Sequence, residues 1–279
     1  MVLASVAFAL MAALARHVSV EADPSLVVLV RSAIVGAVAV ALLAVRGTPL
    51  RFTHHRHLLV RAVAGCLAMA AYFSALSMAP LTEVLTLQHS SPLFVAAASR
   101  ISIGERVSRS SVAWLIFGFL GVLAVLGPPT HISLGSALAV ASAASAAWAY
   151  LIIRRLSGAV DPDAIVVHFS AVALMFSLPW ALNSQPSWDL TAPAWLALTG
   201  MGLCAAVGQV AMTRAYALAP AALVSGVSMT AVPIGAAIGI FAFGERPGLG
   251  MALGAVAIAA SSWALTREGI RTPRPAASG

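Results

Sequence analysis

The sequence predicts an all-α integral membrane protein, with ten transmembrane helices arranged as two inverted five-helix repeats. Three observations lead to this prediction. The 279 residues are 61% hydrophobic and only 9% charged, and the mean hydropathy is +0.96. A water-soluble core does not use so much apolar sequence, whereas a helical membrane protein requires it. Apolar runs of membrane-spanning length follow one another along the chain, and one set of sequence landmarks occurs twice.

The repeated landmarks are an Ala-Pro pair, a proline inside an apolar helix and a Gly-Glu-Arg turn. Between the two copies the Ala-Pro and Gly-Glu-Arg motifs lie 140 residues apart and the prolines 141. Duplication in a membrane protein is typical of secondary transporters, whose halves enclose a site near the middle of the bilayer. The repeat therefore favours transport. Its members are Ala79-Pro80, Pro92 and residues 104–106 in the first copy, and Ala219-Pro220, Pro233 and residues 244–246 in the second.

The ten spans follow from the thickness of the hydrocarbon layer, about 30 Å, which requires roughly 20 apolar residues per helix. Asp23-Pro24 and Asp161-Pro162 are expected to begin the second and seventh spans, because each pairs an N-cap acceptor with proline at the first helical position. Ser133 is expected to cap the sixth span. The first span is short for a membrane helix. The predicted spans are 2–18, 25–45, 58–77, 81–99, 111–127, 133–153, 163–182, 194–217, 221–242 and 248–266.

The arginines predict how the helices are oriented. Twelve of the sixteen cationic residues, all of them arginine, fall on one side of the predicted spans, and three fall on the other. The positive-inside rule places the richer side in the cytoplasm, together with both termini of a protein in the cell inner membrane. The twelve are Arg46, Arg51, Arg56, Arg61, Arg100, Arg106, Arg109, Arg154, Arg155, Arg267, Arg271 and Arg274.

The domain prediction follows from this topology. Residues 1–128 form the first repeat, residues 129–266 the second, and residues 267–279 a disordered cytoplasmic tail. Each half contains an odd number of spans, so the second half is expected to insert upside down relative to the first. The first Gly-Glu-Arg turn would then be cytoplasmic and the second would face outward. Their flanking arginines agree, because the first turn has more of them.

With these landmarks the chain resembles the drug/metabolite transporter superfamily, and within it the EamA-type carriers. The resemblance covers nearly the whole chain. It rests on the two repeats, on the segments from Ala75 to Pro80 and from Ala215 to Pro220, on the mid-helix prolines, on the Gly-Glu-Arg turns and on Arg31 in the second span. It implies ten helices, cytoplasmic termini, alternating access and export or uptake of small metabolites. It implies no particular substrate, since members handle amino acids, nucleotide-linked sugars, S-adenosylmethionine and toxic cations.

The candidate substrate pathway consists of polar, aromatic and proline residues inside the spans. A polar run beginning at Gln88 would be costly against lipid, so it should face the interior. The prolines interrupt backbone hydrogen bonding and would expose helix ends to a polar substrate, or would simply kink the helices for packing. His89 would line the cavity or bond a neighbouring helix, and Gln209 would bind substrate or join helices. The complete set is Tyr72, Gln88, His89, Pro92, Trp148, Gln209 and Pro233.

Other features receive structural interpretations. Tyr150 is expected to anchor its helix at the membrane interface, whereas Trp148 could stack on a planar ligand. Arg214 is expected to reach the interface or to pair at a helix end, and Glu105 to shape its own turn. Small residues at four-residue spacing predict close helix packing. These are Gly235 with Gly239, and Gly250 with Gly254.

An intramembrane enzyme is the rival class of protein. The aspartates lie in predicted loops or at helix ends, no HExxH or GxSxG motif occurs, and the seven histidines do not cluster within spans. A channel would require a ring of charges or a filter sequence, and neither is visible in this sequence. No catalytic residue, metal or cofactor is therefore expected. The expected partners are a small-molecule substrate and the lipid bilayer, without nucleic acid, and a homodimer remains open.

The function that these features predict is that of a secondary-active or facilitative carrier, because no ATP-binding loop is present. Its site is expected mainly between the third, fourth, eighth and ninth spans. Analogy favours export of an amino acid or a related amphiphile. The alternative is uptake of a nucleoside-like metabolite such as S-adenosylmethionine.

Overall fold

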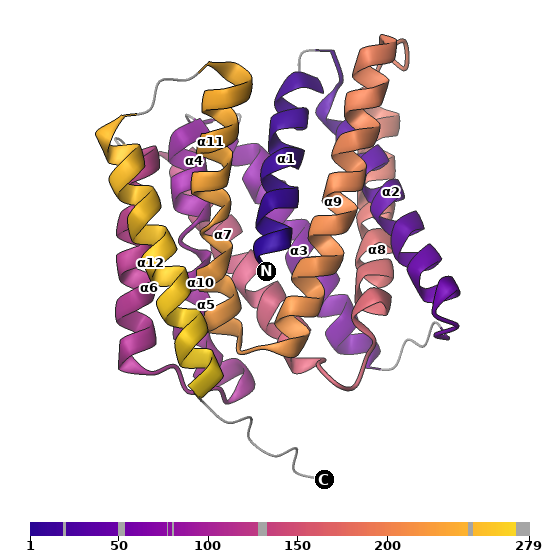
Figure 1. Cartoon of the computed structure of the whole chain (residues 1–279). Coiled ribbons are helices and arrows are strands. Elements are labelled where there is room, and N and C mark those ends of the chain that lie inside the picture. Colours follow the sequence, from indigo (N-terminus) through magenta and orange to yellow (C-terminus); the bar gives the residue numbers. More distant parts are fainter. Residues whose placement is uncertain are drawn as a thin grey trace.

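The computed structural model describes residues 1–18, 21–49, 54–76, 78–79, 81–127, 133–244 and 248–271. These residues form an all-helical bundle without strands (Figure 1). Pro80, Glu245, Arg246 and the last eight residues of the predicted tail lie outside the described residues. The helices are α1 (Val2–Val18), α2 (Pro24–Val45), α3 (His55–Leu76), α4 (Leu81–Gln88), α5 (Ser91–Ile103), α6 (Arg109–Leu126), α7 (Leu134–Arg155), α8 (Pro162–Ser184), α9 (Ala192–Leu218), α10 (Ala221–Ser228), α11 (Ala231–Phe243) and α12 (Leu249–Arg271).

Seven helical segments in the described part of the chain are long and apolar enough to cross a membrane, so this is a multi-pass membrane protein. They are α2, α6, α7, α8, α9, the pair α10–α11, and α12. The remaining predicted spans coincide with α1, α3 and the pair α4–α5. Of these, α1 is short and α3 begins with His55, Arg56 and His57.

The helix starts confirm the predicted caps. The Asp23 carboxylate accepts the backbone N–H of Ser25 at 2.8 Å, and the Asp161 carboxylate accepts that of Asp163 at 2.8 Å. In both cases the first helical residue is proline, whose missing N–H costs nothing at this position. Ser133 forms a capping box at the start of α7.

Two predicted spans, 81–99 and 221–242, are each divided into two helices. The break between α4 and α5 ends two residues before Pro92, and the break between α10 and α11 ends three residues before Pro233. Each proline sits in the first turn of the following helix, where it removes a backbone donor that would otherwise continue the ladder. The second pieces both end at glycine in the left-handed conformation, Gly104 with φ 72° and Gly244 with φ 67°.

The two breaks also share their side-chain chemistry. The Ser90 hydroxyl donates to the Leu87 carbonyl at 2.5 Å, and the Thr230 hydroxyl donates to the Val227 carbonyl at 2.8 Å. These hydroxyls satisfy carbonyls at the end of the first helical piece, in a region where lipid offers no donor. The two interrupted helices run in opposite directions along the bundle: α4 lies above α5, whereas α10 lies below α11 (Figure 1).

The helices pack as antiparallel and crossing pairs around one main core. α3 packs against α7, α1 against α9, α2 against α8, and α6 against α12. The largest cluster of buried apolar residues in the described part of the chain joins α1, α2, α3, α5, α7, α8, α9 and α10. In Figure 1 the N-terminus lies at mid-height of the bundle, and α12 ends at the lower side. Helix α9, which carries Gln209, therefore belongs to this core.

Candidate functional site

Gln88 and His89 lie where α4 ends and before α5 begins. The Oε1 atom of Gln88 is buried without a hydrogen-bond partner among the described residues. Tyr72 of α3 packs in one apolar cluster with Val84 and Leu87 of α4. The structure therefore packs Tyr72 against α4, the helix that ends at Gln88, and His89 is the next residue along the chain.

The His89 ring turns back onto its own helix. Its Nδ1 atom lies 2.7 Å from the Leu85 carbonyl oxygen, which also accepts the His89 backbone N–H at 3.1 Å. Because a carbonyl oxygen can only accept, this contact assigns the ring proton to Nδ1 and leaves Nε2 as an acceptor.

Helix α9 carries a second group of buried polar atoms. Gln209 is 4% exposed, and its Nε2 atom has no hydrogen-bond partner in the part of the chain that the structure describes. The hydroxyls of Thr213 and Tyr216 are likewise buried without a hydrogen bond there, although Tyr216 lies near Ser225. Residues 209, 213 and 216 follow helical spacing, so the three side chains share one face. Buried polar atoms are normally satisfied, and this stripe is an exception.

Gln209 was among the predicted pathway residues and Thr213 and Tyr216 were not, although their spacing of four and seven residues from Gln209 could have indicated them. Tyr216 stacks on Tyr150 of α7, with ring centres 4.7 Å apart and an interplanar angle of 15°. The interpretation of Tyr150 as an interface anchor is wrong. Its ring packs between α7 and α9 because Tyr216 offers it a parallel aromatic face.

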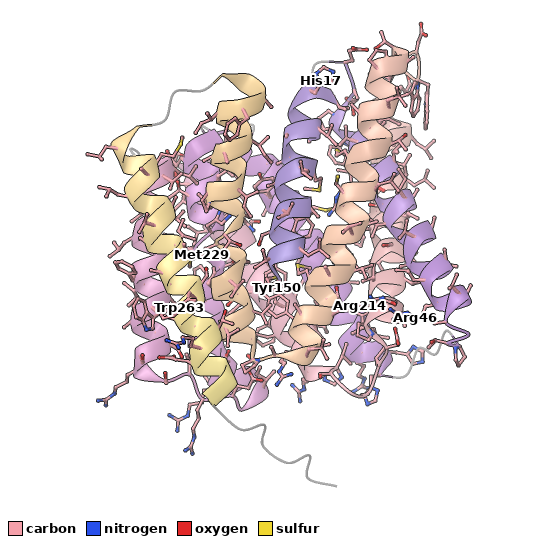
Figure 2. The ribbon with its side chains drawn as sticks, viewed as in Figure 1. His17, Arg46, Tyr150, Arg214, Met229 and Trp263 are labelled. Carbon is pink, nitrogen blue, oxygen red and sulfur yellow. The ribbon has the colours of Figure 1, made fainter. Side chains whose placement is uncertain are left out.

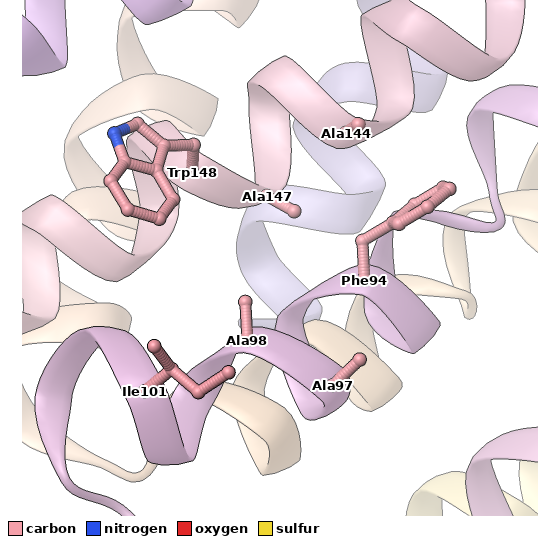
Figure 3. Close-up of a pocket in the computed structure, with 7 residues that line it drawn as sticks. All are labelled: Phe94, Ala97, Ala98, Ile101, Ala144, Ala147 and Trp148. Carbon is pink, nitrogen blue, oxygen red and sulfur yellow. The ribbon is translucent and has the colours of Figure 1, made fainter.

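Trp148 lies in a different environment. A cavity of about 360 Å³ opens between α5 and α7, and Figure 3 shows the side chains that border it. All are apolar apart from the indole nitrogen, and Trp148 is 45% exposed, so the cavity is a groove on the outside of the bundle. Its lining residues are Phe94, Ala97, Ala98, Ile101, Ala144, Ala147 and Trp148.

An ion-pair cluster holds the arginine-rich end together. The fully buried carboxylate of Asp163 accepts from Arg214 at 3.0 and 2.6 Å and from Arg46 at 3.0 Å. Arg46 and Arg214 lie close together at the lower end of the bundle (Figure 2). The predicted helix-end pairing of Arg214 is confirmed, because Asp163 belongs to the first turn of α8.

Glu105 links distant elements. Its carboxylate accepts from Arg154 Nε of α7 at 2.5 Å and from the Ala221 backbone N–H at 3.0 Å. Ala221 is the first residue of α10, where a carboxylate is favoured electrostatically. Glu105 therefore does more than shape its own turn, because it joins the α5–α6 connection to α7 and α10.

Arg61, one of the arginines counted on the predicted cytoplasmic side, is buried inside the bundle. The residue is 3% exposed, and its guanidinium carbon lies 4.4 Å from the centre of the Phe169 ring. Its position inside the predicted span 58–77, with Gly65 one helical turn later, was the available signal. Arg31, by contrast, contacts the Met69 sulfur at 3.6 Å. Among the described residues, no three His, Cys, Asp or Glu side chains are grouped as a metal site.

Apolar spanning helices, two interrupted helices and buried polar side chains between them define a multi-pass membrane transporter. Comparison with known proteins specifies the family. The model of the EamA-like transporter family matches residues 1–127 and again residues 133–267. The chain belongs to this family.

Several characterised relatives are similar over much of the chain. The pseudopaline exporter CntI of Pseudomonas aeruginosa is 32% identical over 272 residues, covering 95% of this chain and 94% of the relative. A riboflavin transporter of Rhizobium johnstonii is 31% identical, with 80% and 74% covered, and one of Vibrio cholerae is 29% identical, with 94% and 89% covered. A solved crystal structure superimposes with a TM-score of 0.85 at 21% identity, covering 96% of each chain, which shows a shared fold alone.

Proposed function

We propose that this protein is a secondary-active or facilitative carrier that moves a small metabolite across the cell inner membrane by alternating access. The observation that carries the proposal is the set of buried amide atoms without partners, Gln88 Oε1 and Gln209 Nε2. Leaving such atoms unpaired away from water costs free energy, so a site for a polar ligand or water accounts for them. A transporter needs such groups, whereas helix packing does not.

The arrangement of the helices supports two inverted repeats, residues 1–128 and 129–266, which would move against each other. Helices α4–α5 and α10–α11 break at positions 140 residues apart and run in opposite directions (Figure 1). The packing of α5 against α7 has its counterpart in α11 against α1, and that of α3 against α7 in α9 against α1. If the two halves exchanged conformations, the site would close on one side of the membrane and open on the other.

The arginine-rich end, which includes Arg46, Arg154 and Arg214, is the cytoplasmic end in this proposal, and the termini belong to the same side. The substrate pathway is formed by the two interrupted helices with α3 and α9, and Tyr72, Gln88, His89, Pro92, Gln209 and Pro233 line it. Trp148 would contact substrate only through its outer groove. The protein acts without catalysis.

An amino acid or a related amphiphile is the proposed substrate, and export is the proposed direction. The similarity to an exporter over 95% of the chain supports the direction. The buried amide of Gln209 lies on the same face of α9 as Tyr216, which stacks on Tyr150, and this combination suits a molecule with both polar and apolar parts. Uptake of a nucleoside-like metabolite such as S-adenosylmethionine is the second candidate, and the similarity to riboflavin transporters favours a planar ring system.

The test is a release assay with the purified full chain in proteoliposomes. Vesicles are loaded with amino acids, riboflavin and S-adenosylmethionine, and released compounds are measured by mass spectrometry. We expect release of amino acids, slowed about tenfold in Gln209→Ala by loss of one buried hydrogen bond. The exposed amide of Asn183 on α8 provides the matched control, Asn183→Ala, which should transport normally.

Each contrary result removes a defined part of the proposal. Release of none of the compounds would reject an amino acid carrier and its alternatives. Release of riboflavin or S-adenosylmethionine alone would replace the substrate class. Equal rates in wild type and Gln209→Ala would remove Gln209 from the pathway.

A further inference from the structure

Arg61 is a buried cation without a counter-charge. It lies two turns into α3, is 3% exposed, and its Nε atom has no hydrogen-bond partner among the described residues. Three other arginines in the described part of the chain, Arg46, Arg154 and Arg214, form ion pairs with carboxylates. No carboxylate of the described residues pairs with Arg61.

The guanidinium points toward the interior. A Cβ atom built on Gly65 would lie 2.6 Å from Arg61 Nη1 and 2.7 Å from a ring carbon of Phe169. Gly65 is one turn further from the arginine-rich end of α3, so the side chain extends along the helix toward mid-membrane. An arginine that only avoided lipid would extend the other way, toward the interface. The absence of a side chain at Gly65 gives the guanidinium its room.

The neighbours of Arg61 leave its charge unbalanced. Its titratable neighbours are Tyr150, Cys66 and His168, and none of these side chains is an anion at neutral pH. The face of the Phe169 ring attracts the cation, but it has no acceptor atom for the N–H groups at the edge of the guanidinium. Guanidinium carries five donors, and an arginine inside a membrane protein normally pairs or marks a substrate path.

Tyr150 connects this cation to the polar stripe on α9. Its ring stacks on Tyr216, and Tyr216 shares a helix face with Thr213 and Gln209. A molecule that reached Arg61 with an anionic group could therefore place an apolar part against the two tyrosines and polar groups along α9.

We propose that Arg61 binds the carboxylate of the transported metabolite, so that the substrate class is an anionic, ring-bearing or amphiphilic carboxylate. This inference rests on the proposed carrier function and assigns Arg61 a part in specificity. A planar guanidinium fits a carboxylate with two parallel hydrogen bonds, which a lysine cannot reproduce.

The test is a binding measurement that does not depend on transport. Benzoate and benzamide have the same shape and differ in charge, so each is titrated against the purified full chain while its melting temperature is followed. We expect benzoate but not benzamide to stabilise wild type. Arg61→Gln should weaken benzoate binding by about tenfold to a hundredfold. Arg109→Gln, at an exposed position on α6, should bind as wild type does.

Two further variants keep the positive charge. Gly65→Ala should weaken benzoate binding because its methyl group takes the space of the guanidinium, and Arg61→Lys should bind with intermediate affinity. They decide the question if Arg61→Gln does not fold. The proposal is overturned if wild type ignores benzoate, if benzamide binds equally well, or if every Arg61 and Gly65 variant obtained binds benzoate as wild type does. Absence of release from vesicles despite benzoate binding would instead count against the carrier function.

Discussion

Asp163 joins α8 to α9 and to the end of α2 at the arginine-rich end. Its carboxylate is fully buried, while the side chains of Arg214 and Arg46 are 32% and 46% exposed. Asp163→Asn would keep the shape and remove the charge that both arginines share. Breaking a buried ion pair costs roughly 3–5 kcal/mol, and partial exposure of the arginines places the expected loss of unfolding free energy at the lower end, about 3 kcal/mol.

Thermal unfolding of the purified protein in detergent measures this loss. Asp189→Asn makes the same chemical change in an exposed segment between α8 and α9 and should leave the melting temperature unchanged. If both variants melted with wild type, the ion-pair cluster would not stabilise the fold.

At the scale of helices, α6 and α12 approach each other closely at glycine residues. A Cβ atom on Gly254 would collide with the Gly121 carbonyl oxygen, and one on Gly250 would lie 2.6 Å from the Ala124 carbonyl oxygen. Gly254→Ala should therefore push α12 away from α6 and lower stability by about 1–3 kcal/mol.

Gly235→Ala is the matched control for this prediction. A Cβ atom on Gly235 meets no heavy atom within 4 Å, so alanine there should leave stability unchanged or raise it by up to about 1 kcal/mol through helix propensity. Unfolding of the two variants in detergent decides between them. Destabilisation of Gly235→Ala alone would show that the α6–α12 contact is not a close backbone approach.

The same glycines show what sequence can predict. Caps at Asp23 and Asp161 and the broken helices were predictable, because they depend on residues that are neighbours in the chain. Spacing predicted close packing for Gly235 as well as Gly254, and for Gly235 the prediction was wrong, since spacing does not reveal which surface faces it. The partner of Arg61 was not predictable for the same reason: Phe169 lies more than 100 residues later in the chain.

For the whole molecule, the contacts of Glu105 with Arg154 and Ala221 join the first half of the chain to the second at one end of the bundle. At the opposite end Glu21 accepts the Thr191 hydroxyl at 2.9 Å, so each end has a polar contact between halves. In alternating access, the contact at one end of the bundle would open while the contact at the other end stays closed. This requires the two ends of the bundle to face opposite sides of the membrane.

Cysteine accessibility tests that orientation. In a Cys66→Ala, Cys204→Ala background, single cysteines replace two exposed residues, Arg106 near the end of α5 and Gly248 before α12. A membrane-impermeant maleimide applied to intact cells should label Gly248→Cys, and Arg106→Cys should react only after permeabilisation, because the arginine-rich end is cytoplasmic. Labelling of both from the same side would place the two Gly-Glu-Arg turns on one face, and a bundle built from oppositely inserted halves could not produce that result.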